Sequence, residues 1–278
     1  MTIKFIDLFC GIGGFRKGIE DAAKELNIPV KCVFSSEIEK NAVKIYEKNF
    51  GDVPSGDITK ISANDIGDFD ILCGGFPCQD VSTLGKRGGL CASRTGLFFD
   101  VIRIAKEKQP KIIFLENVKG LLTSNKGWDF ARVIVELEDI GYEVEAELLD
   151  SKDFGVPHRR KRVYIIGHLR TAPTNRIFPI IREEESICNE SREKPKGVRN
   201  VASTLTKLGH DKWNENYVRY SNGDIRTLTP IECERLQGYP DNWTAGVSDK
   251  YRYECLGNTV TVNVVKAVAT KILQTLSQ

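Results

Sequence analysis

Cys78 occupies a position in this sequence that favours chemical reactivity. It follows an apolar stretch at residues 69–73 that is typical of a buried strand, and the rigid Pro77 precedes it directly. A cysteine at the end of a strand is most often a small buried apolar residue. Here polar residues follow it, and residues 85–94 are glycine-rich and basic, as expected of a loop that closes over an anionic substrate. We therefore interpret Cys78 as a nucleophile.

Glu116 supplies a second reactive group, at the end of the expected strand at residues 111–115. A thiolate and a carboxylic acid on neighbouring strands separate a nucleophile from a general acid. This pair suits the modification of a cytosine ring. C5 of cytosine is a poor nucleophile until C6 is attacked, and that attack is easier when N3 is protonated or hydrogen-bonded. Cys78 would attack C6, and Glu116 would supply the proton.

A glycine turn near the amino terminus indicates a site for a nucleoside cofactor. Residues 5–15 show a strand, a G-x-G-G turn and the start of a helix, where the backbone can approach a ligand closely. Glu37 could accept hydrogen bonds from ribose hydroxyls, and Asp57 could hold an adenine amino group. Each carboxylate taken alone is more often a solvated surface group. These features leave both a nicotinamide dinucleotide and S-adenosylmethionine open, although the turn differs from the G-x-G-x-x-G of dinucleotide enzymes.

The elements that would position these groups alternate between strands and helices. Strands are expected at six short apolar segments, residues 3–8, 30–35, 69–73, 111–115, 144–149 and 163–167. Helices are expected between them, at residues 15–26, 40–49, 97–107 and 128–140. This alternation predicts an α/β fold with a doubly wound, mostly parallel, Rossmann-like sheet. Such folds bind ligands beyond the carboxyl ends of the strands, where Cys78 and Glu116 fall.

The chain changes character after the sixth expected strand. Between residues 171 and 226 the apolar periodicity fades and charges of both signs mix, which predicts a small irregular domain. Helical patterns return at residues 229–238 and 261–276. We therefore expect a catalytic domain at residues 1–170 and 227–278, with the second domain at 171–226.

The composition is that of an ordinary globular protein. The 278 residues are 41% hydrophobic and 28% charged with a net charge of +2, so a site for a polyanion must be a local patch. The eight cysteines form no C-x-x-C pair, which argues against a disulfide scaffold and against a metal site. No apolar run reaches the roughly 18 residues of a membrane span, and no signal peptide precedes the first strand. We therefore expect an intracellular protein that binds no metal.

Five segments resemble, in order, the motif series of the DNA cytosine-C5 methyltransferases of bacterial and phage restriction-modification systems. They are residues 5–15, 75–79 (Gly-Phe-Pro-Cys-Gln), 116–118 (Glu-Asn-Val), 160–162 (Arg-Lys-Arg) and 257–260 (Gly-Asn-Thr-Val). Residues 228–240 also resemble a family motif, and the similarity spans nearly the whole chain apart from about 171–200. The resemblance implies the fold of S-adenosylmethionine-dependent methyltransferases with a small target-recognition domain.

The resemblance also implies a role for each matching residue. Cys78 would bond to C6 of the cytosine and Glu116 would contact N3. Arg160 and Arg162 would help to orient the base and the catalytic loop. The pocket for S-adenosylmethionine would be lined by Phe15, Glu37, Ile38, Asp57, Ile58, Pro77, Leu97, Asn258 and Val260. The C-terminal helix would pack beside the first strand, so that Asn258 reaches this pocket. Cys78 would leave by β-elimination after transfer, and S-adenosylhomocysteine would be the second product.

Two positions depart from the family pattern. His158 stands where the family commonly has Gln, two residues before Arg160, and we expect this change to alter the mechanism little. Ile38 stands where an aromatic residue often stacks on adenine. Because an aliphatic side chain replaces a stacked ring, weaker cofactor binding is expected.

Double-stranded DNA is the partner that the resemblance implies. A target base inside a duplex must be flipped out, at a cost of a few kcal/mol. Residues expected to contact the DNA lie after Cys78 and in the second domain, namely Ser82, Lys86, Arg87, Arg94, Thr204, Lys207, Lys212 and Arg219. Residues 201–206 resemble the segment that closes the recognition domain against DNA. Most of these contacts would go to phosphates, because positioning contacts outnumber base readout.

Three alternatives require other features. A related branch that modifies tRNA tends to carry Pro-Pro-Cys-Gln and Cys-Phe-Thr, whereas this chain has Phe-Pro-Cys-Gln at 76–79 and no Cys-Phe-Thr. A non-catalytic DNA-binding relative would lack Cys78, Glu116 or Arg162, and all three are present. A nicotinamide-dependent dehydrogenase leaves the motifs around Cys78 and Glu116 without a purpose. We expect a monomeric, cytoplasmic, nucleoid-associated enzyme of a bacterial or phage-infected cell, without a membrane partner, and any cognate restriction endonuclease outside a physical complex.

Overall fold

A six-stranded sheet forms the centre of the computed structural model, which describes residues 2–77, 96–172, 174–180, 202, 205, 217–219 and 225–278. Its strands are β1 (Ile3–Leu8), β2 (Val30–Ser36), β3 (Ile71–Gly75), β4 (Ile112–Val118), β5 (Tyr142–Asp150) and β6 (Lys161–Leu169). They lie in the order β2-β1-β3-β4-β6-β5. Strand β6 is antiparallel to both of its neighbours, β4 and β5, whereas the pairs β1–β2, β1–β3 and β3–β4 are parallel. The predicted mostly parallel, Rossmann-like sheet is therefore confirmed.

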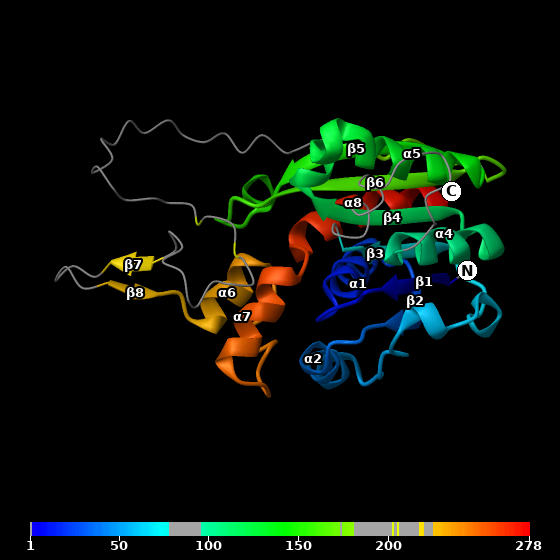
Figure 1. Ribbon diagram of the computed structural model, residues 1–278. Coiled ribbons are helices and arrows are strands. Elements are labelled where there is room, and N and C mark those ends of the chain that lie inside the picture. The colour runs from blue at the N-terminus through cyan, green and yellow to red at the C-terminus, as the bar shows by residue number, and fades with distance from the viewer. Residues whose placement is uncertain are drawn as a thin grey trace.

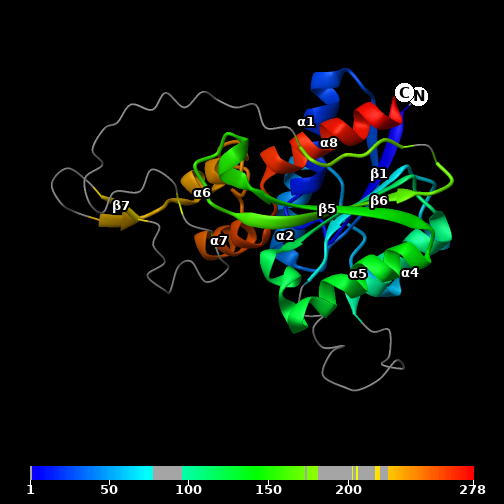
Figure 2. The same ribbon diagram turned by 90° about the horizontal axis from the view of Figure 1, so that it is seen from above.

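Helices cover both faces of this sheet (Figures 1 and 2). The α-helices are α1 (Gly14–Leu26), α2 (Lys40–Phe50), α4 (Leu97–Lys108), α5 (Trp128–Asp139), α6 (Pro230–Leu236), α7 (Asp249–Asn258) and α8 (Val262–Leu276). Figure 2 shows α1 and α8 on one face and α4 and α5 on the other. Because strand side chains alternate, Ile3 and Phe5 of β1 join the α1 and α8 core, whereas Ile6 and Leu8 join the α4 and α5 core.

The C-terminal helix returns to the beginning of the chain. A Cβ atom on Gly18 of α1 would lie 2.6 Å from Val265 Cγ1 of α8, so the glycine permits this close helix packing. Val264 and Val268 share the apolar core with Phe5. The ends of the chain consequently lie together in Figure 2, as expected from the sequence.

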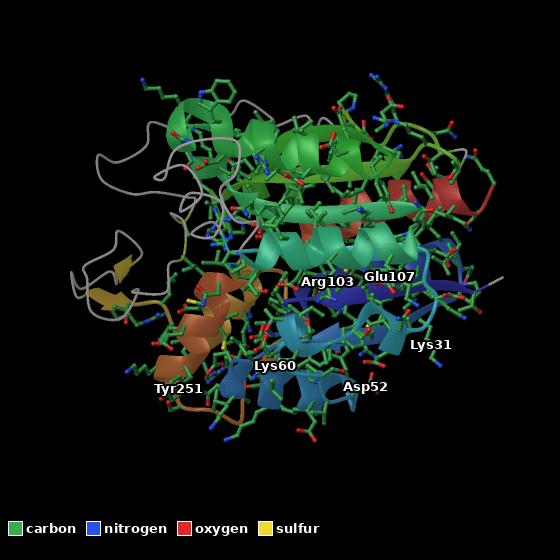
Figure 3. All side chains as sticks on the ribbon, turned by 45° about the vertical axis from the view of Figure 1, so that its right-hand side comes forward. Lys31, Asp52, Lys60, Arg103, Glu107 and Tyr251 are labelled. Carbon is green, nitrogen blue, oxygen red and sulfur yellow. The ribbon has the colours of Figure 1, made fainter. Side chains whose placement is uncertain are left out.

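Short 3₁₀ helices connect the strands at η1 (Ile58–Lys60), η2 (Ala63–Asp65), η4 (Lys119–Leu122), η5 (Ser124–Gly127) and η6 (Ser151–Phe154). Arg103 of α4 fixes the first of these connections, because its guanidinium donates to the carbonyl oxygens of Ile58 at 3.0 Å and Ile61 at 2.9 Å. Figure 3 labels Arg103 on α4 and Lys60 on this connection. Asp57 and Ile58 are thereby held near the edge of the sheet.

Several elements differ from the sequence expectation. The third strand extends through Gly75, because pairing with β4 continues over two glycines that have no strand preference of their own. Helix α7 was not predicted, since its residues show no apolar stripe. Helix α6 is shorter than expected, because Thr229 caps its start and Gly238 has a φ of +80° after its end.

Few residues of the predicted second domain are described. Strands β7 (Tyr217–Arg219) and β8 (Ile225–Thr227) form an antiparallel pair beyond α6 in Figure 1. Residues 174–180 lie along β5, where the Ile177 amide donates to Glu145 Oε1 at 2.6 Å. The domain boundaries stay a prediction. Within the described ranges, none of the helices has the length and apolar character to cross a membrane.

Candidate active site

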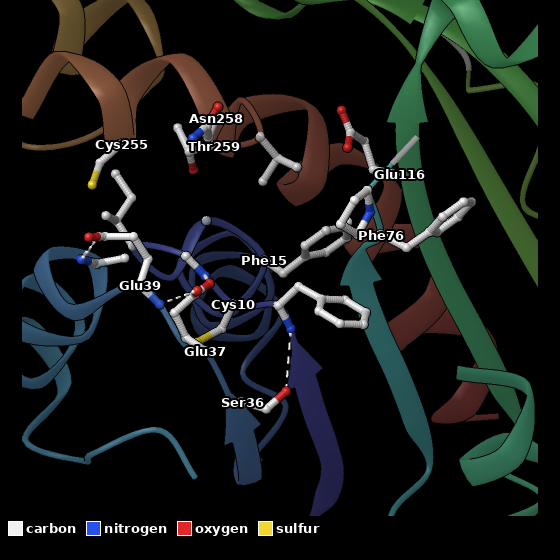
Figure 4. A pocket seen from close by; sticks show the side chains of 18 of the residues that line it. Cys10, Phe15, Ser36, Glu37, Glu39, Phe76, Glu116, Cys255, Asn258 and Thr259 are labelled. Carbon is white, nitrogen blue, oxygen red and sulfur yellow. Dashed lines mark hydrogen bonds between the residues drawn. The ribbon is translucent and has the colours of Figure 1, made fainter. Parts of the chain in front are cut away.

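A cavity of about 650 Å³ opens at the carboxyl edge of the sheet, within the size range of small-molecule sites. It lies between the ends of β1 to β4 and the segment that joins α7 to α8. The cavity is lined by all nine residues predicted for the cofactor pocket, which are Phe15, Glu37, Ile38, Asp57, Ile58, Pro77, Leu97, Asn258 and Val260. Glu116, Arg160 and Arg162 line it as well. Figure 4 shows Glu116 and Phe76 on one side and Glu37 and Glu39 on the other.

The glycine turn brings the amino end of α1 close to the C-terminal segment. A Cβ atom on Gly14 would lie 2.6 Å from Val260 Cγ2 and 2.7 Å from the Tyr239 hydroxyl. Gly13 has a φ of +84°, a conformation that favours glycine. These glycines therefore let Val260 close one wall of the cavity directly against α1.

Glu37 is held in place by backbone amides. Its Oε2 accepts from the Gly11 amide at 2.9 Å, and its Oε1 accepts from the amides of Ile38 at 2.8 Å and Glu39 at 2.9 Å. The carboxylate thus links the end of β2 to the glycine turn. Each carboxylate oxygen can accept further hydrogen bonds, so Glu37 remains able to bind hydroxyl groups of a ligand.

Ile38 and Asp57 both line the cavity. Ile38 is 69% exposed and has apolar surface free for a ligand. Asp57 Oδ1 accepts from the hydroxyl of Thr59 at 2.8 Å and from its amide at 3.1 Å, and these hydrogen bonds lower the pKa of Asp57. Asp57 is therefore ionised at neutral pH.

Negative charge predominates along the described lining. The carboxylates that contribute are Glu37, Glu39, Asp57 and Glu254, whereas the cations are Arg160 and Arg162. A cavity with this balance attracts a cationic ligand and repels a polyphosphate.

Glu116 lies where the chemistry was predicted. It pairs with Gly75 across β3 and β4, and a Cβ atom on Gly75 would lie 3.2 Å from Glu116 Oε2. Arg162 Nε lies 3.0 Å from Glu116 Oε1. Burial raises the pKa of the Glu116 carboxyl, and the positive charges of Arg162 and Arg160 oppose this increase. Glu116 is thus a buried acid with an enhanced ability to hold a proton.

Arg160 is also buried, with a relative exposure of 2%, and its hydrogen-bond partners are backbone carbonyls. Its Nη1 donates to Leu205 O at 3.0 Å, while Nη2 donates to Gly257 O at 3.1 Å and Thr259 O at 2.7 Å. Burial lowers its pKa to about 9, which leaves it charged at neutral pH. Arg160 therefore holds the backbone of the C-terminal wall.

The segment before Cys78 is fixed by Asn117, whose Nδ2 donates to Phe76 O at 2.9 Å. Cys78 itself lies outside the described residues. The same holds for Ser82, Lys86, Arg87, Arg94, Thr204, Lys207 and Lys212, and for the side chain of Arg219. The predicted DNA contacts therefore stay predictions.

Several structural residues of the site were not singled out from the sequence. Ser151 Oγ donates to Thr261 Oγ1 at 2.8 Å, and Thr261 Oγ1 donates to Gln237 Oε1 at 2.8 Å. Gln237 Nε2 donates to Leu256 O at 2.7 Å. This buried chain joins the end of β5 to α6 and α7. Gln237 belongs to a segment that was noted only as a motif, and spacing gave no signal for Ser151 or Thr261.

Asp7 is a second residue that the sequence did not reveal. It is fully buried at the end of β1, and neither carboxyl oxygen has a well-placed hydrogen-bond partner among the described residues. Burial raises its pKa to about 8. Asp7 is consequently protonated at neutral pH. In the described ranges, no group of three or more His, Cys, Asp or Glu side chains could hold a metal ion.

An open, mostly parallel sheet with an acid-lined pocket at its carboxyl edge is typical of the Rossmann-like folds that bind nucleoside cofactors. The model of the C-5 cytosine-specific DNA methylases matches residues 3–221 and 190–274. The chain belongs to this family and is a DNA cytosine-C5 methyltransferase.

Curated relatives resemble the chain over nearly its whole length. It is 39% identical to type II methyltransferase M1.ScrFI of Lactococcus lactis subsp. cremoris, over 99% of this chain and 79% of the relative. It is 34% identical to type II methyltransferase M.HhaI of Haemophilus parahaemolyticus, over 99% of this chain and 95% of the relative.

A solved structure also has the same fold. The Dnmt2 methyltransferase of S. pombe superposes with a TM-score of 0.76 at 21% identity, over 99% of this chain and 98% of that one. At this identity the likeness concerns the fold alone.

Proposed function

We propose that the chain transfers a methyl group from S-adenosylmethionine to C5 of a flipped-out cytosine in a short double-stranded DNA sequence, through a covalent bond between Cys78 and C6. The observation that carries this proposal is the placement of Glu116. It is a buried acid with a raised pKa, and it pairs with Gly75, three residues before Cys78. It also lines the same cavity as the proposed cofactor residues.

The lining residues fit S-adenosylmethionine. Bound S-adenosylmethionine supplies a methyl group on a positively charged sulfonium. Glu37 would accept from the ribose hydroxyls, and Asp57 from the adenine amino group, with Ile38 and Ile58 beside the adenine ring. The carboxylates of Glu37, Glu39, Asp57 and Glu254 favour a cationic ligand over a nicotinamide dinucleotide, whose diphosphate they would repel.

The base would be activated from two sides. The Cys78 thiolate adds to C6 of cytosine, and Glu116 gives its proton to N3, so that electron density moves to C5. Arg162 holds the Glu116 carboxylate that remains. After transfer the C5 proton is lost, the Cys78 sulfur leaves C6 by β-elimination, and Glu116 recovers the N3 proton. Arg160 orients the wall at Gly257 and Thr259.

DNA recognition would belong to the predicted domain at residues 171–226, with residues 1–170 and 227–278 as the catalytic domain. Thr204, Lys207, Lys212 and Arg219 would contact the duplex from this domain. Ser82, Lys86, Arg87 and Arg94 would contact it beside the active site. The type II methyltransferases among the relatives support a role in a restriction-modification system, and we propose that the enzyme acts on DNA as a cytoplasmic monomer without a physically bound endonuclease.

A methylation assay tests this proposal. The protein is incubated with S-adenosylmethionine and unmethylated plasmid DNA, and with tRNA in a parallel reaction. Mass spectrometry detects 5-methylcytosine, and bisulfite sequencing locates it. Methylation of DNA at one short recurring site is expected. Methylation of tRNA alone would identify RNA as the substrate. Absence of product despite cofactor binding would indicate that the chain is a non-catalytic relative of the DNA enzymes.

A further inference from the structure

His158 is a fully buried histidine that bridges two parts of the chain. Its Nδ1 lies 3.2 Å from the carbonyl oxygen of Leu236, at the end of α6, and its Nε2 accepts from the Leu205 amide at 3.1 Å. A carbonyl can only accept and an amide N–H can only donate. The proton must therefore sit on Nδ1, and a single neutral tautomer satisfies both partners.

The surroundings keep this imidazole neutral. Burial lowers the pKa of His158 to about 4, and the charges of Arg160 and Arg162 act in the same direction. The Leu236 carbonyl opposes this effect only in part. His158 therefore keeps Nε2 as an acceptor throughout the neutral pH range.

The bridged residues join the predicted recognition domain to the catalytic domain. The Ala202 amide donates to Pro157 O at 2.7 Å, and the Arg159 amide donates to Ala202 O at 2.8 Å. Arg160 donates to the Leu205 carbonyl, and His158 accepts from the Leu205 amide, so two side chains of the segment before β6 hold both backbone groups of Leu205. The Leu205 side chain packs on the apolar cluster of α6 and α7. Hydrogen bonds consequently hold the amide and the carbonyl of both Ala202 and Leu205.

This attachment lies next to the reaction site. The guanidinium of Arg160 that holds Leu205 also holds Gly257 and Thr259 in the cavity wall. A displacement of Leu205 would change where the recognition domain presents DNA to Glu116. It would leave the distant Glu37 and Asp57 in place.

We propose that His158 is a positioning residue that fixes Leu205 against α6, so that DNA bound by the recognition domain meets the active site in the correct register. The inference rests on the proposed function. A glutamine could replace both contacts, because its amide nitrogen donates and its oxygen accepts. A leucine of similar size can replace neither. An asparagine keeps the polar group but is too short to reach both partners.

His168 provides a matched control. It is a buried histidine at the other end of β6, and it also makes two side-chain hydrogen bonds, to Glu145 at 2.8 Å and to Thr174 at 2.8 Å. It lines no part of the described cavity. Thr174 lies near the start of the predicted recognition domain, whereas Ala202 and Leu205 make none of their hydrogen bonds with His168. Loss of His168 should therefore lower stability without releasing Leu205 from its contacts.

The experiment compares H158L, H158N, H158Q and H168L. Methylation kinetics on plasmid DNA give kcat and KM, calorimetry gives the Kd for S-adenosylmethionine, and fluorescence anisotropy gives the Kd for a duplex with the target site. We expect H158L and H158N to raise the KM and Kd for DNA about tenfold, equivalent to about 1.4 kcal/mol, with little change in cofactor Kd. H158Q should restore both values, and H168L should lower Tm only.

Three results would overturn the positioning role: an unchanged DNA affinity in H158L and H158N, an equal loss in H168L, or no recovery in H158Q. If H158L does not fold, H158N and H158Q still give the comparison. A wild-type protein that binds duplex DNA without methylating it would refute the proposed function. The duplex Kd values would still test the role of His158.

Discussion

Replacement of Ile38 by tryptophan should tighten cofactor binding. Ile38 lines the cavity but leaves 69% of its surface exposed, so a larger ring can be accommodated at this rim. A stacked aromatic pair contributes about 0.5–1.5 kcal/mol beyond the area that it buries. Ile38→Trp should therefore lower the Kd for S-adenosylmethionine by about twofold to about tenfold.

Isothermal titration calorimetry would measure this change for S-adenosylmethionine, S-adenosylhomocysteine and adenosine. Because the gain comes from the adenine ring, all three ligands should gain by a similar factor. Val53→Trp is the matched control, since Val53 is 61% exposed and lines no part of the described cavity. An equal gain in Val53→Trp, or a gain for S-adenosylmethionine without one for adenosine, would refute the placement of adenine beside Ile38.

Three further substitutions test the acid and the packing around it. Glu116→Gln should lower the single-turnover rate constant by about 10²–10⁴-fold with an unchanged cofactor Kd. Wild-type activity should fall as the pH rises through the raised pKa of Glu116, because the acid then loses its proton. An unchanged rate constant in Glu116→Gln would exclude a general-acid role. Gly75→Ala should lower kcat, because its Cβ atom would displace the Glu116 carboxyl. Gly67→Ala is the control and should leave kcat unchanged, since its Cβ atom would meet no atom within 4 Å. Equal effects of the two substitutions would contradict the contact between residue 75 and Glu116. Asp7 binds a proton in the folded state between about pH 4 and its pKa of about 8, whereas the unfolded chain does not, so the free energy of unfolding should fall across this range by about 5 kcal/mol. Asp7→Asn should remove this slope in urea titrations, and a persistent slope would assign it to other groups.

The sheet and much of the site could be predicted because their signals are local. Apolar runs gave the six strands, and Cys78 and Glu116 were recognised because each follows such a run. The resemblance then named the cavity residues that the fold brings together. Residue type and position relative to a strand thus pointed to Cys78 and Glu116, whereas most of the cavity residues were named by the resemblance.

The remaining features depend on contacts between distant segments. The partners of Arg160 are backbone carbonyls of Leu205, Gly257 and Thr259, and no side-chain pattern marks a carbonyl as a partner. Helix α7 was not predicted because its sequence has no apolar stripe. It is stabilised by packing against α6 and α2. The exchange of the family's Gln for His158 was expected to alter the mechanism little, and no local pattern marked the hydrogen bonds that His158 makes with residues 47 and 78 positions away.

Transfer of an isotopically labelled methyl group tests the central claim most directly. S-Adenosylmethionine with a trideuteromethyl group would be incubated with unmethylated plasmid and either wild-type protein or Cys78→Ser. Mass spectrometry of the digested DNA should show trideuteromethylated cytosine, labelled at C5, with the wild type alone, while calorimetry shows that both proteins bind the cofactor. Label on another base or ring position would contradict cytosine-C5 chemistry, and wild-type turnover by Cys78→Ser would contradict the covalent mechanism.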